Sequence, residues 1–243
     1  MEEKTRKVLE KFKEELKGLL GENLKAIVLY GSGARGDFVP GKSDINLLLV
    51  LGQVDFGSLI KIGKMLRRYR AHRFASPVVV DPEYLKRSLD VFPIEFEEMK
   101  RHHQVIYGED FISELEISHS DLRLQLEREI KQNLLWLREL IIEHPSLSRR
   151  FVQLLLNASR SLSSQIRALL LLMPKAGEQE LEPLVRLEKL IGSQLPCLRW
   201  LVGLRERERA PKKAEVQNIL PSLLEELEHL ACWVDQLEIE LEK

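Results

Sequence analysis

A glycine-rich turn that carries a serine and an arginine is the first candidate for chemistry in this 243-residue sequence. Gly31-Ser32-Gly33 follows an apolar run, and Arg35 comes two residues later. Glycine lets the backbone adopt a positive φ and approach a ligand closely, and exposed N–H groups at such a turn suit phosphate oxygens. Ser32 adds a hydroxyl donor and Arg35 a fixed positive charge. We expect Gly31, Ser32 and Arg35 to bind phosphate, unless the turn is an ordinary connection between two core strands.

Two polar residues at the start of the next apolar run form the second candidate. Asp44 and Asn46 stand at positions i and i+2, which places both on the same side of a strand. A pair of carboxylates at this spacing, beside a phosphate loop, would suit a Mg²⁺-assisted phosphoryl or nucleotidyl transfer. In this sequence the second position is an amide, so only half of that pair is present.

A third acid is expected from the acidic segment that follows residue 90. The alternation of apolar and polar residues over 91–99 predicts a strand whose apolar side chains share one face. Glu95 and Glu97 then share the other face, and we expect Glu95 to lie beside Asp44. Glu97 and Asp90 are the next candidates, and the alternative is that these acids form the solvated face of an edge strand.

The whole string resembles the signature of the DNA polymerase β-type nucleotidyltransferase superfamily: Gly-Ser, a short loop with Arg-Gly, then Ser-Asp-x-Asp entering an apolar strand. The residues that fall on this pattern are Gly31, Ser32, Arg35, Gly36, Ser43 and Asp44. The resemblance is strongest over residues 24–51 and extends more loosely through residue 110.

The resemblance implies a protein that binds a nucleoside triphosphate with Mg²⁺ and transfers a nucleotidyl group to a hydroxyl acceptor. It implies that Asp44 and Glu95 are catalytic acids, and that Asp44, Asn46 and Glu95 hold the metal. It also implies that Arg35 lies near the leaving group. Because the family's second Asp is Asn46 here, catalysis is expected to be weakened. The alternative is a non-catalytic nucleotide sensor or partner-binding module, such as one half of a two-component system. The sequence identifies neither the acceptor nor the base of the nucleotide.

The elements that must position these residues follow from the spacing of apolar side chains. The opening segment is predicted to be a helix that ends at Gly21, and strands are predicted at 25–30, 44–51, 77–80 and 91–99, with a fifth near 105–107. A helix after an N-cap at Asp55 is expected to bury one apolar face. That face consists of Phe56, Leu59, Ile60, Gly63 and Leu66.

The second half of the sequence is leucine-rich with a helical period, and its most apolar segment, 151–173, is expected at the centre of a bundle. We therefore predict an α+β protein: a small mixed-sheet nucleotidyltransferase domain over 1–115 and a helical bundle over 116–243. The bundle resembles the one appended to aminoglycoside nucleotidyltransferases, and we expect the ligand between the two halves.

Composition limits the partners. The net charge is -1, and the basic residues between 61 and 73 are interpreted as a solvated helix, so nucleic acid is not an expected partner. The charged N-terminus lacks a following apolar run, and arginines interrupt the most apolar segment, so neither a signal peptide nor a membrane partner is expected. The sequence predicts a cytoplasmic protein, and it is compatible with a homo-oligomer.

Overall fold

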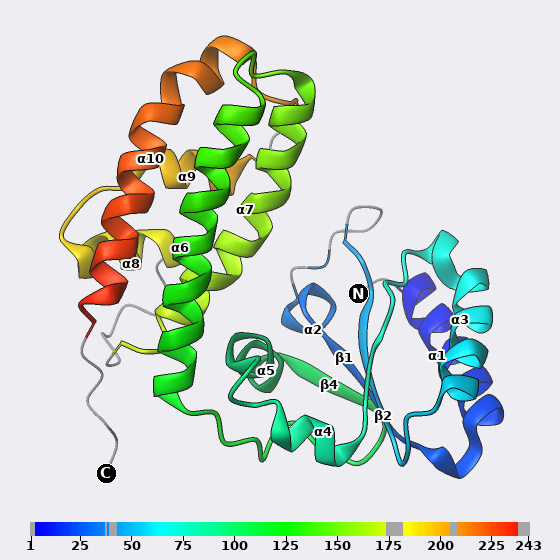
Figure 1. Cartoon of the computed structure of the whole chain (residues 1–243). Helices are drawn as coiled ribbons and strands as arrows, with labels where there is room; N and C mark the ends of the chain where they lie inside the picture. Colours follow the sequence, from blue (N-terminus) through cyan, green and yellow to red (C-terminus); the bar gives the residue numbers. More distant parts are fainter. Residues whose placement is uncertain (1–2, 37, 39–42, 174–181, 205–208, 238–243) are drawn as a thin grey trace. The chain divides into compact units, whose positions relative to one another are not determined.

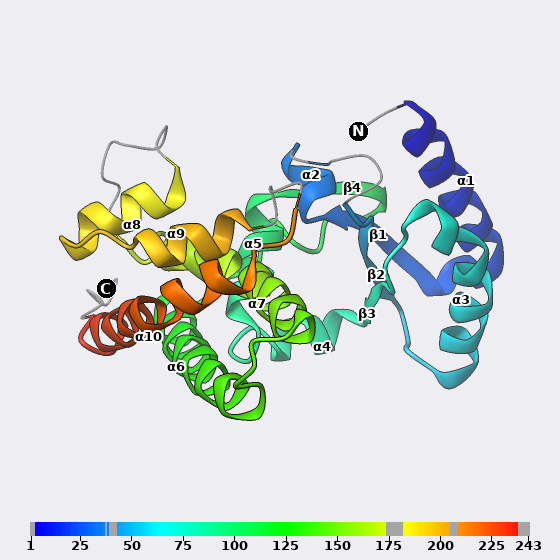
Figure 2. The ribbon, with the colours of Figure 1, turned by 90° about the horizontal axis from the view of Figure 1, so that it is seen from above.

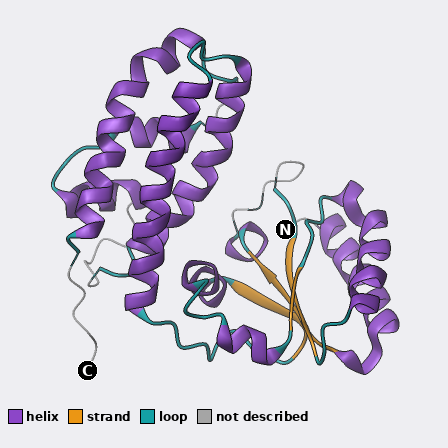
Figure 3. Ribbon diagram, in the orientation of Figure 1, coloured by secondary structure: helices purple, strands orange, loops and turns teal. Residues whose placement is uncertain are grey.

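The chain is an α+β protein that consists of two compact units, Met1–Ile117 and Ser118–Lys243 (Figure 1). The computed structural model describes residues 3–36, 38, 43–173, 182–204 and 209–237. Among these residues, all strands belong to the first unit (Figure 3). No helix in the described parts of the chain is long and apolar enough to cross a membrane.

The first unit contains a four-stranded mixed sheet and its covering helices. In chain order its elements are α1 (Glu3–Leu20), the 3-10 turn η1 (Gly21–Asn23), β1 (Leu24–Tyr30), α2 (Ser32–Arg35), β2 (Asn46–Leu51), α3 (Phe56–Tyr69), the 3-10 turn η2 (Arg70–His72), β3 (Val78–Val80), α4 (Pro82–Arg87), α5 (Pro93–Arg101) and β4 (His103–Gly108).

The strand order is β3-β2-β1-β4, with β1 antiparallel to both neighbours and β2 parallel to β3. Side chains alternate between the two faces of each strand, so the sheet has two cores. The helices α1 and α3 cover one face, and α4 and α5 lie on the other (Figures 1 and 2). The end of β1 that leads into Gly31 is therefore held between two packed layers.

Three aromatic side chains fix the α1 and α3 layer. The ring of Phe12 on α1 lies 5.0 Å from that of Tyr69 on α3 and 4.7 Å from that of Phe74, measured between centroids. All three rings are buried. This cluster anchors the segment between α3 and β3, which an isolated bridge also joins to Ile45 at the start of β2.

The prediction of a strand over 91–99 is wrong, because the chain forms helix α5 there. Pro93 occupies the first turn, where its missing N–H costs nothing, and Glu95 follows in the same turn. Lys100 and Arg101 complement the last turn. Over so few residues, apolar alternation does not distinguish a strand from a helix, and the proline was the better signal.

The predicted buried face of α3 is also wrong except at Leu66. Phe56 is 80% exposed, and Leu59 and Ile60 are each 42% exposed. The helix carries two apolar stripes, and the one that includes Ile62 and Met65 packs against the α1 layer. Asp55 does cap the helix, because its side chain accepts the N–H of Ser58 at 3.0 Å.

The second unit is a helical bundle. Its helices are α6 (His119–Glu143), α7 (Arg149–Leu169), α8 (Pro183–Ile191), α9 (Pro196–Gly203) and α10 (Lys213–Asp235). The predicted central segment forms α7, which packs against α6, α8 and α9. A partly buried polar network joins α6 to α7: the buried Gln165 accepts from Asn133 at 2.7 Å and donates to Glu129 at 2.8 Å. Satisfied buried groups of this kind favour one helix register.

Candidate functional site

The turn after β1 has the tight geometry that the glycine predicts. Gly31 has φ 68° and ψ −147°, a conformation that L side chains rarely adopt. A Cβ at this position would meet Asn46 Nδ2 at 3.0 Å. The carbonyl of Gly31 accepts the N–H groups of Ala34 and Arg35 at 3.1 and 3.0 Å. As the first residues of a helix, Ser32 and Gly33 have N–H groups without an acceptor inside that helix.

A row of three polar side chains crosses the sheet at the end of β1. Tyr30 is in register with Asn46 on β2 and with His103 on β4. Directly paired residues project from the same face. Burial, reinforced by the negative charges of Glu98 and Glu95, raises the pKa of Tyr30. The row therefore lies on the α5 side of the sheet, next to the two acids.

The arginine of the loop is held by Glu98, an acid that is not among the candidates predicted from the sequence. Arg35 Nη1 lies 2.6 Å from Glu98 Oε1, and both side chains are largely buried. Glu98 lies one helical turn after Glu95, so both acids act on the same region of the sheet. A helical interpretation of 93–101, supported by Pro93, places Glu95 and Glu98 on one face, but it does not identify Arg35 as the partner of Glu98.

Asp44 pairs with an arginine from a distant part of the chain. Arg73 Nη2 lies 2.8 Å from Asp44 Oδ1, and Arg73 Nε donates to the backbone carbonyl of Ser43 at 3.1 Å. By sequence, Arg73 is one of the basic residues of 61–73 that are interpreted as solvated. No local pattern predicts its contact, because tertiary packing brings the residue to the start of β2.

The candidates for the third acid lie on α5 or just before it. Glu95 is exposed in the first turn of α5, and Asp90 is exposed just before that helix. Glu97 is paired with Arg101 of the same helix at 2.7 Å. The placement of Glu95 beside Asp44 stays a prediction. Glu95 belongs to a helix and not to the predicted strand.

These side chains do not fit the set of acids that a two-metal site needs. Of the two strand positions, Asp44 is engaged by Arg73 and Asn46 is a neutral amide. Two divalent ions close together require several negative ligands to offset their repulsion. Within the described residues, no three His, Cys, Asp or Glu side chains form a group that could hold a metal ion.

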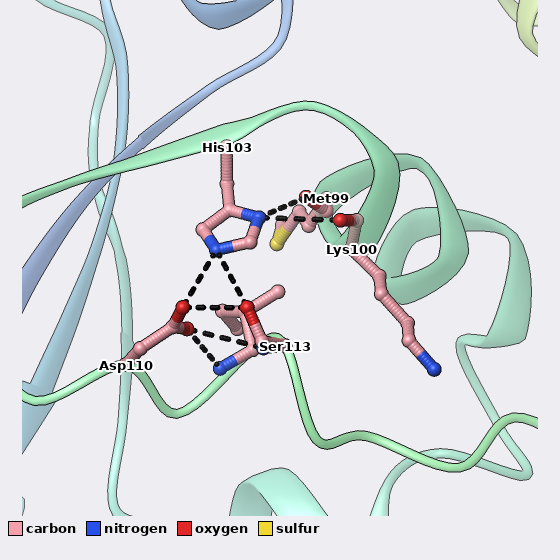
Figure 4. A network of polar contacts seen from close by, with 6 residues as sticks. Met99, Lys100, His103, Asp110 and Ser113 are labelled. Carbon is pink, nitrogen blue, oxygen red and sulfur yellow. Dashed lines mark hydrogen bonds and ion pairs between the residues drawn. The ribbon is translucent and has the colours of Figure 1, made fainter.

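The other edge of β1 carries a polar network around His103, shown in Figure 4. The Nδ1 atom of His103 lies 3.0 Å from the carbonyl oxygen of Met99 and 3.3 Å from that of Lys100, so Nδ1 carries a proton. Its Nε2 faces both Asp110 Oδ2 at 3.2 Å and Ser113 Oγ at 3.5 Å. Serine and aspartate share one ring nitrogen here, which is not the arrangement of a nucleophilic triad.

Asp110 is the centre of that network. Its Oδ1 accepts the N–H groups of Ile112 and Ser113 at 2.9 and 3.1 Å, and its Oδ2 accepts the Ser113 hydroxyl at 2.5 Å. Partial burial on its own would raise the pKa of Asp110. The hydrogen bonds from Ser113, Ile112 and His103 outweigh it and hold the pKa well below its usual range. This acid stabilises the turn after β4.

A groove of about 510 Å³ lies on the opposite face of the sheet, between α1, α2 and β4. It borders the loop through Gly33 and Ala34 and is charged at Arg6 and Glu10. Its other lining residues are Leu9, Leu29, Gln104 and Ile106. The groove is separate from the Asn46, Tyr30 and His103 row, since Leu29 and Tyr30 project from opposite faces of β1.

Comparison with known proteins gives the same assignment as the loop and the sheet. A family model described as a nucleotidyltransferase domain matches residues 7–142, which is more than half of the chain. Among solved structures, the fold is similar to that of spectinomycin adenyltransferase AAD(9) from Enterococcus faecialis, solved with ATP and spectinomycin. The TM-score is 0.58 at 15% identity, and the match covers 92% of this chain and 99% of that chain. No curated protein matches the sequence.

The fold and the loop thus define an α+β nucleotidyltransferase-type protein with a helical second part. The chain belongs to the nucleotidyltransferase domain family, consistent with the DNA polymerase β-type superfamily. At 15% identity the structural match establishes the fold alone, and the match includes helices of both units because it covers nearly the whole chain.

Proposed function

We propose that this protein binds a nucleoside triphosphate at the Gly31-Ser32 turn and transfers its nucleotidyl group weakly or not at all. The observation that carries this proposal is the incomplete acid set beside an intact phosphate loop. The turn keeps its glycine geometry, whereas Asn46 replaces one acid and Arg73 engages the other. The protein therefore retains nucleotide binding while catalysis is weakened or lost. This combination suits a nucleotide sensor.

The loop residues have separate roles in this proposal. The N–H groups that follow Gly31 and the hydroxyl of Ser32 hold phosphate oxygens. Arg35 adds a positive charge, and it must exchange Glu98 for phosphate when the ligand binds, because the two are paired at 2.6 Å. The structurally similar adenyltransferase was solved with ATP, which makes ATP the first nucleotide to test.

Beyond binding a nucleotide, the family's activity includes transfer of the nucleotidyl group to an acceptor. The family pattern implies that Asp44 and Glu95, with Asn46, bind metal. Because their chemistry does not fit two metal ions, no metal-dependent step is assigned to them. A measurement of turnover therefore decides whether a hydroxyl compound serves as the acceptor.

The direct test is calorimetric titration with ATP, GTP, CTP and UTP, with and without Mg²⁺. We expect one nucleotide to bind, and we expect Arg35→Gln to weaken that binding by about tenfold, since one charge-assisted phosphate contact is lost. The matched control is Arg101→Gln, which removes an arginine paired with a glutamate of the same helix α5. Steady nucleotidyl transfer by the wild-type protein, abolished by Asp44→Ala, would show an active enzyme instead.

A further inference from the structure

A guanidinium group contacts two oxygens at the position of the acid in the family motif. Arg73 contacts both a carboxylate oxygen of Asp44, at 2.8 Å, and the carbonyl oxygen of Ser43, at 3.1 Å. Carboxylate and carbonyl oxygens are the ligands that Mg²⁺ and Ca²⁺ take in proteins. In this chain one fixed positive charge takes both of them.

The backbone builds Arg73 into this place. Its φ is 62°, a left-handed conformation that costs free energy for any residue other than glycine and persists only where the surroundings enforce it. Its carbonyl accepts the N–H of Ile45 at 2.9 Å, and the N–H of Ala75 bonds back to the carbonyl of Ile45 at 3.1 Å. Phe74 between them is buried in the aromatic cluster with Phe12.

Among the described residues at the start of β2, the charge of Asp44 is matched by that of Arg73. Asp44 contributes one negative charge, Arg73 one positive charge, and Asn46 none. A divalent ion at Asp44 would lie next to the guanidinium and would be repelled by it. Mg²⁺ also gives up its water ligands reluctantly, so a single compensated carboxylate offers it little.

We infer that Arg73 is a built-in cation that takes the place of a divalent metal ion at Asp44, so that this site binds a nucleotide without a metal at that carboxylate. The inference rests on the proposed nucleotide binding and goes beyond it by stating that binding is independent of metal. It also assigns Arg73 as the residue that positions Asp44.

The experiment titrates Mn²⁺ into the full chain without nucleotide and follows the signal of free Mn²⁺ by electron paramagnetic resonance. The wild type and Asn46→Asp are expected to show no tight binding, because Arg73 is still present. The double variant Arg73→Gln with Asn46→Asp is expected to bind Mn²⁺ at least about tenfold more tightly than Asn46→Asp alone. Adding Asp44→Asn to the double variant is expected to abolish that binding.

Two further variants control for charge and for folding. Arg68→Gln with Asn46→Asp removes a neighbouring arginine that pairs with Glu15 at 2.9 Å, and it is expected to behave like Asn46→Asp alone. Arg73→Gly with Asn46→Asp accepts the positive φ without strain and is expected to reproduce the gain. Equal Mn²⁺ affinity of Asn46→Asp and the double variant contradicts the inference. So does a folded double variant that binds no Mn²⁺.

A second arm uses ATP as the probe, in EDTA and in Mg²⁺. The inference predicts that the wild type binds ATP in EDTA within about twofold of its affinity in Mg²⁺. Binding that requires Mg²⁺ contradicts the inference and leaves the proposed function intact. Absence of binding of any nucleotide under both conditions contradicts the proposed function, while the Mn²⁺ titration still decides whether Arg73 excludes a metal.

Discussion

Asp44 precedes β2 and Asp110 follows β4, the two strands that flank β1, and the protein uses these carboxylates in different ways. Asp110, after β4, accepts hydrogen bonds from the backbone and hydroxyl of Ser113 and the backbone of Ile112, and it faces His103. Asp44, before β2, has Arg73 as its ion-pair partner among the described residues. Asp110 therefore closes a local turn, whereas Asp44 is paired with a cation brought by tertiary packing.

The difference shows that the number and source of partners indicate the role of an acid better than its charge does. Most donors to Asp110 come from the next three residues, so its oxygens are satisfied by local structure and are unsuited to a ligand. The carboxylate of Asp44 is 46% exposed and that of Asp110 39%, so exposure alone does not separate them. Asp44 is the carboxylate that lies within the family motif, and among the described residues its ion-pair partner is a side chain distant in sequence.

The largest expected effect is on stability at Asp110. Asp110→Ala leaves two backbone N–H groups, a hydroxyl and an imidazole without their acceptor, and we expect it to lower the free energy of unfolding by about 2 kcal/mol. Asp44→Ala removes an exposed ion pair and is expected to cost less than about 1 kcal/mol. Urea denaturation of both variants measures the comparison. Equal losses would show that Asp44 has a structural role that its contacts do not reveal.

A smaller effect is expected from the backbone of the motif. Gly31→Ala places a Cβ at φ 68° and 3.0 Å from Asn46 Nδ2, so we expect a loss of about 1.5 kcal/mol in unfolding free energy. Gly36→Ala is the matched control, because it also has a positive φ, 92°, but has open space around its Cβ position. Its expected loss is about 1 kcal/mol. A larger loss at Gly36 than at Gly31 would contradict the role assigned to the close contact with Asn46.

Asp110 is also expected to contribute to the dependence of the unfolding free energy on pH. The pKa of Asp110 is lower in the folded chain than in the unfolded chain, so its contribution is complete above the unfolded value, about 4. The contribution is lost as the pH falls below that value toward the folded pKa. We expect Asp110→Asn to reduce the difference in stability between pH 5 and pH 3, measured by thermal unfolding. An unchanged difference would show that Asp110 does not titrate differently in the two states.

Much of the fold could be predicted from the sequence because long apolar periods and the glycine turn are local signals. The strands near 25–30 and 44–51, the helices of the second half and the cap at Asp55 all have such signals, and the structure contains them. The alternation of Phe92, Ile94 and Phe96 predicts a strand over 91–99, whereas the structure has a helix that begins at Pro93. The buried face of α3 was misassigned because the helix has two apolar stripes, and only packing selects between them.

The site was harder to predict, since its charges are paired across long stretches of sequence. The loop residues Gly31 and Ser32 were visible as a motif. The pairing of Arg35 with Glu98 depends on α5 being a helix, and that of Asp44 with Arg73 depends on the bridge between Ile45 and Phe74. Neither pairing has a sequence period, so a single sequence does not contain a signal for them.

The smallest expected effect concerns the charge of Asp44 during nucleotide binding. Asp44→Asn removes a negative charge near the phosphate loop and keeps an oxygen that can accept from Arg73. If Arg73 compensates Asp44 in place of a metal, ATP affinity in EDTA should rise by about twofold, because the carboxylate no longer opposes an anionic ligand. The rise is small since Asp44 is half-exposed and screened by salt. Glu22→Gln is the control, because it removes an exposed acid at the opposite end of β1 and is expected to leave the affinity unchanged. Isothermal titration in EDTA and in Mg²⁺ gives both values. A fall of about tenfold in ATP affinity that occurs only in Mg²⁺ would identify Asp44 as a ligand of the metal bound to the nucleotide. Asp44 and Asp110 would then differ because Asp44 binds metal, and not because Arg73 compensates its charge.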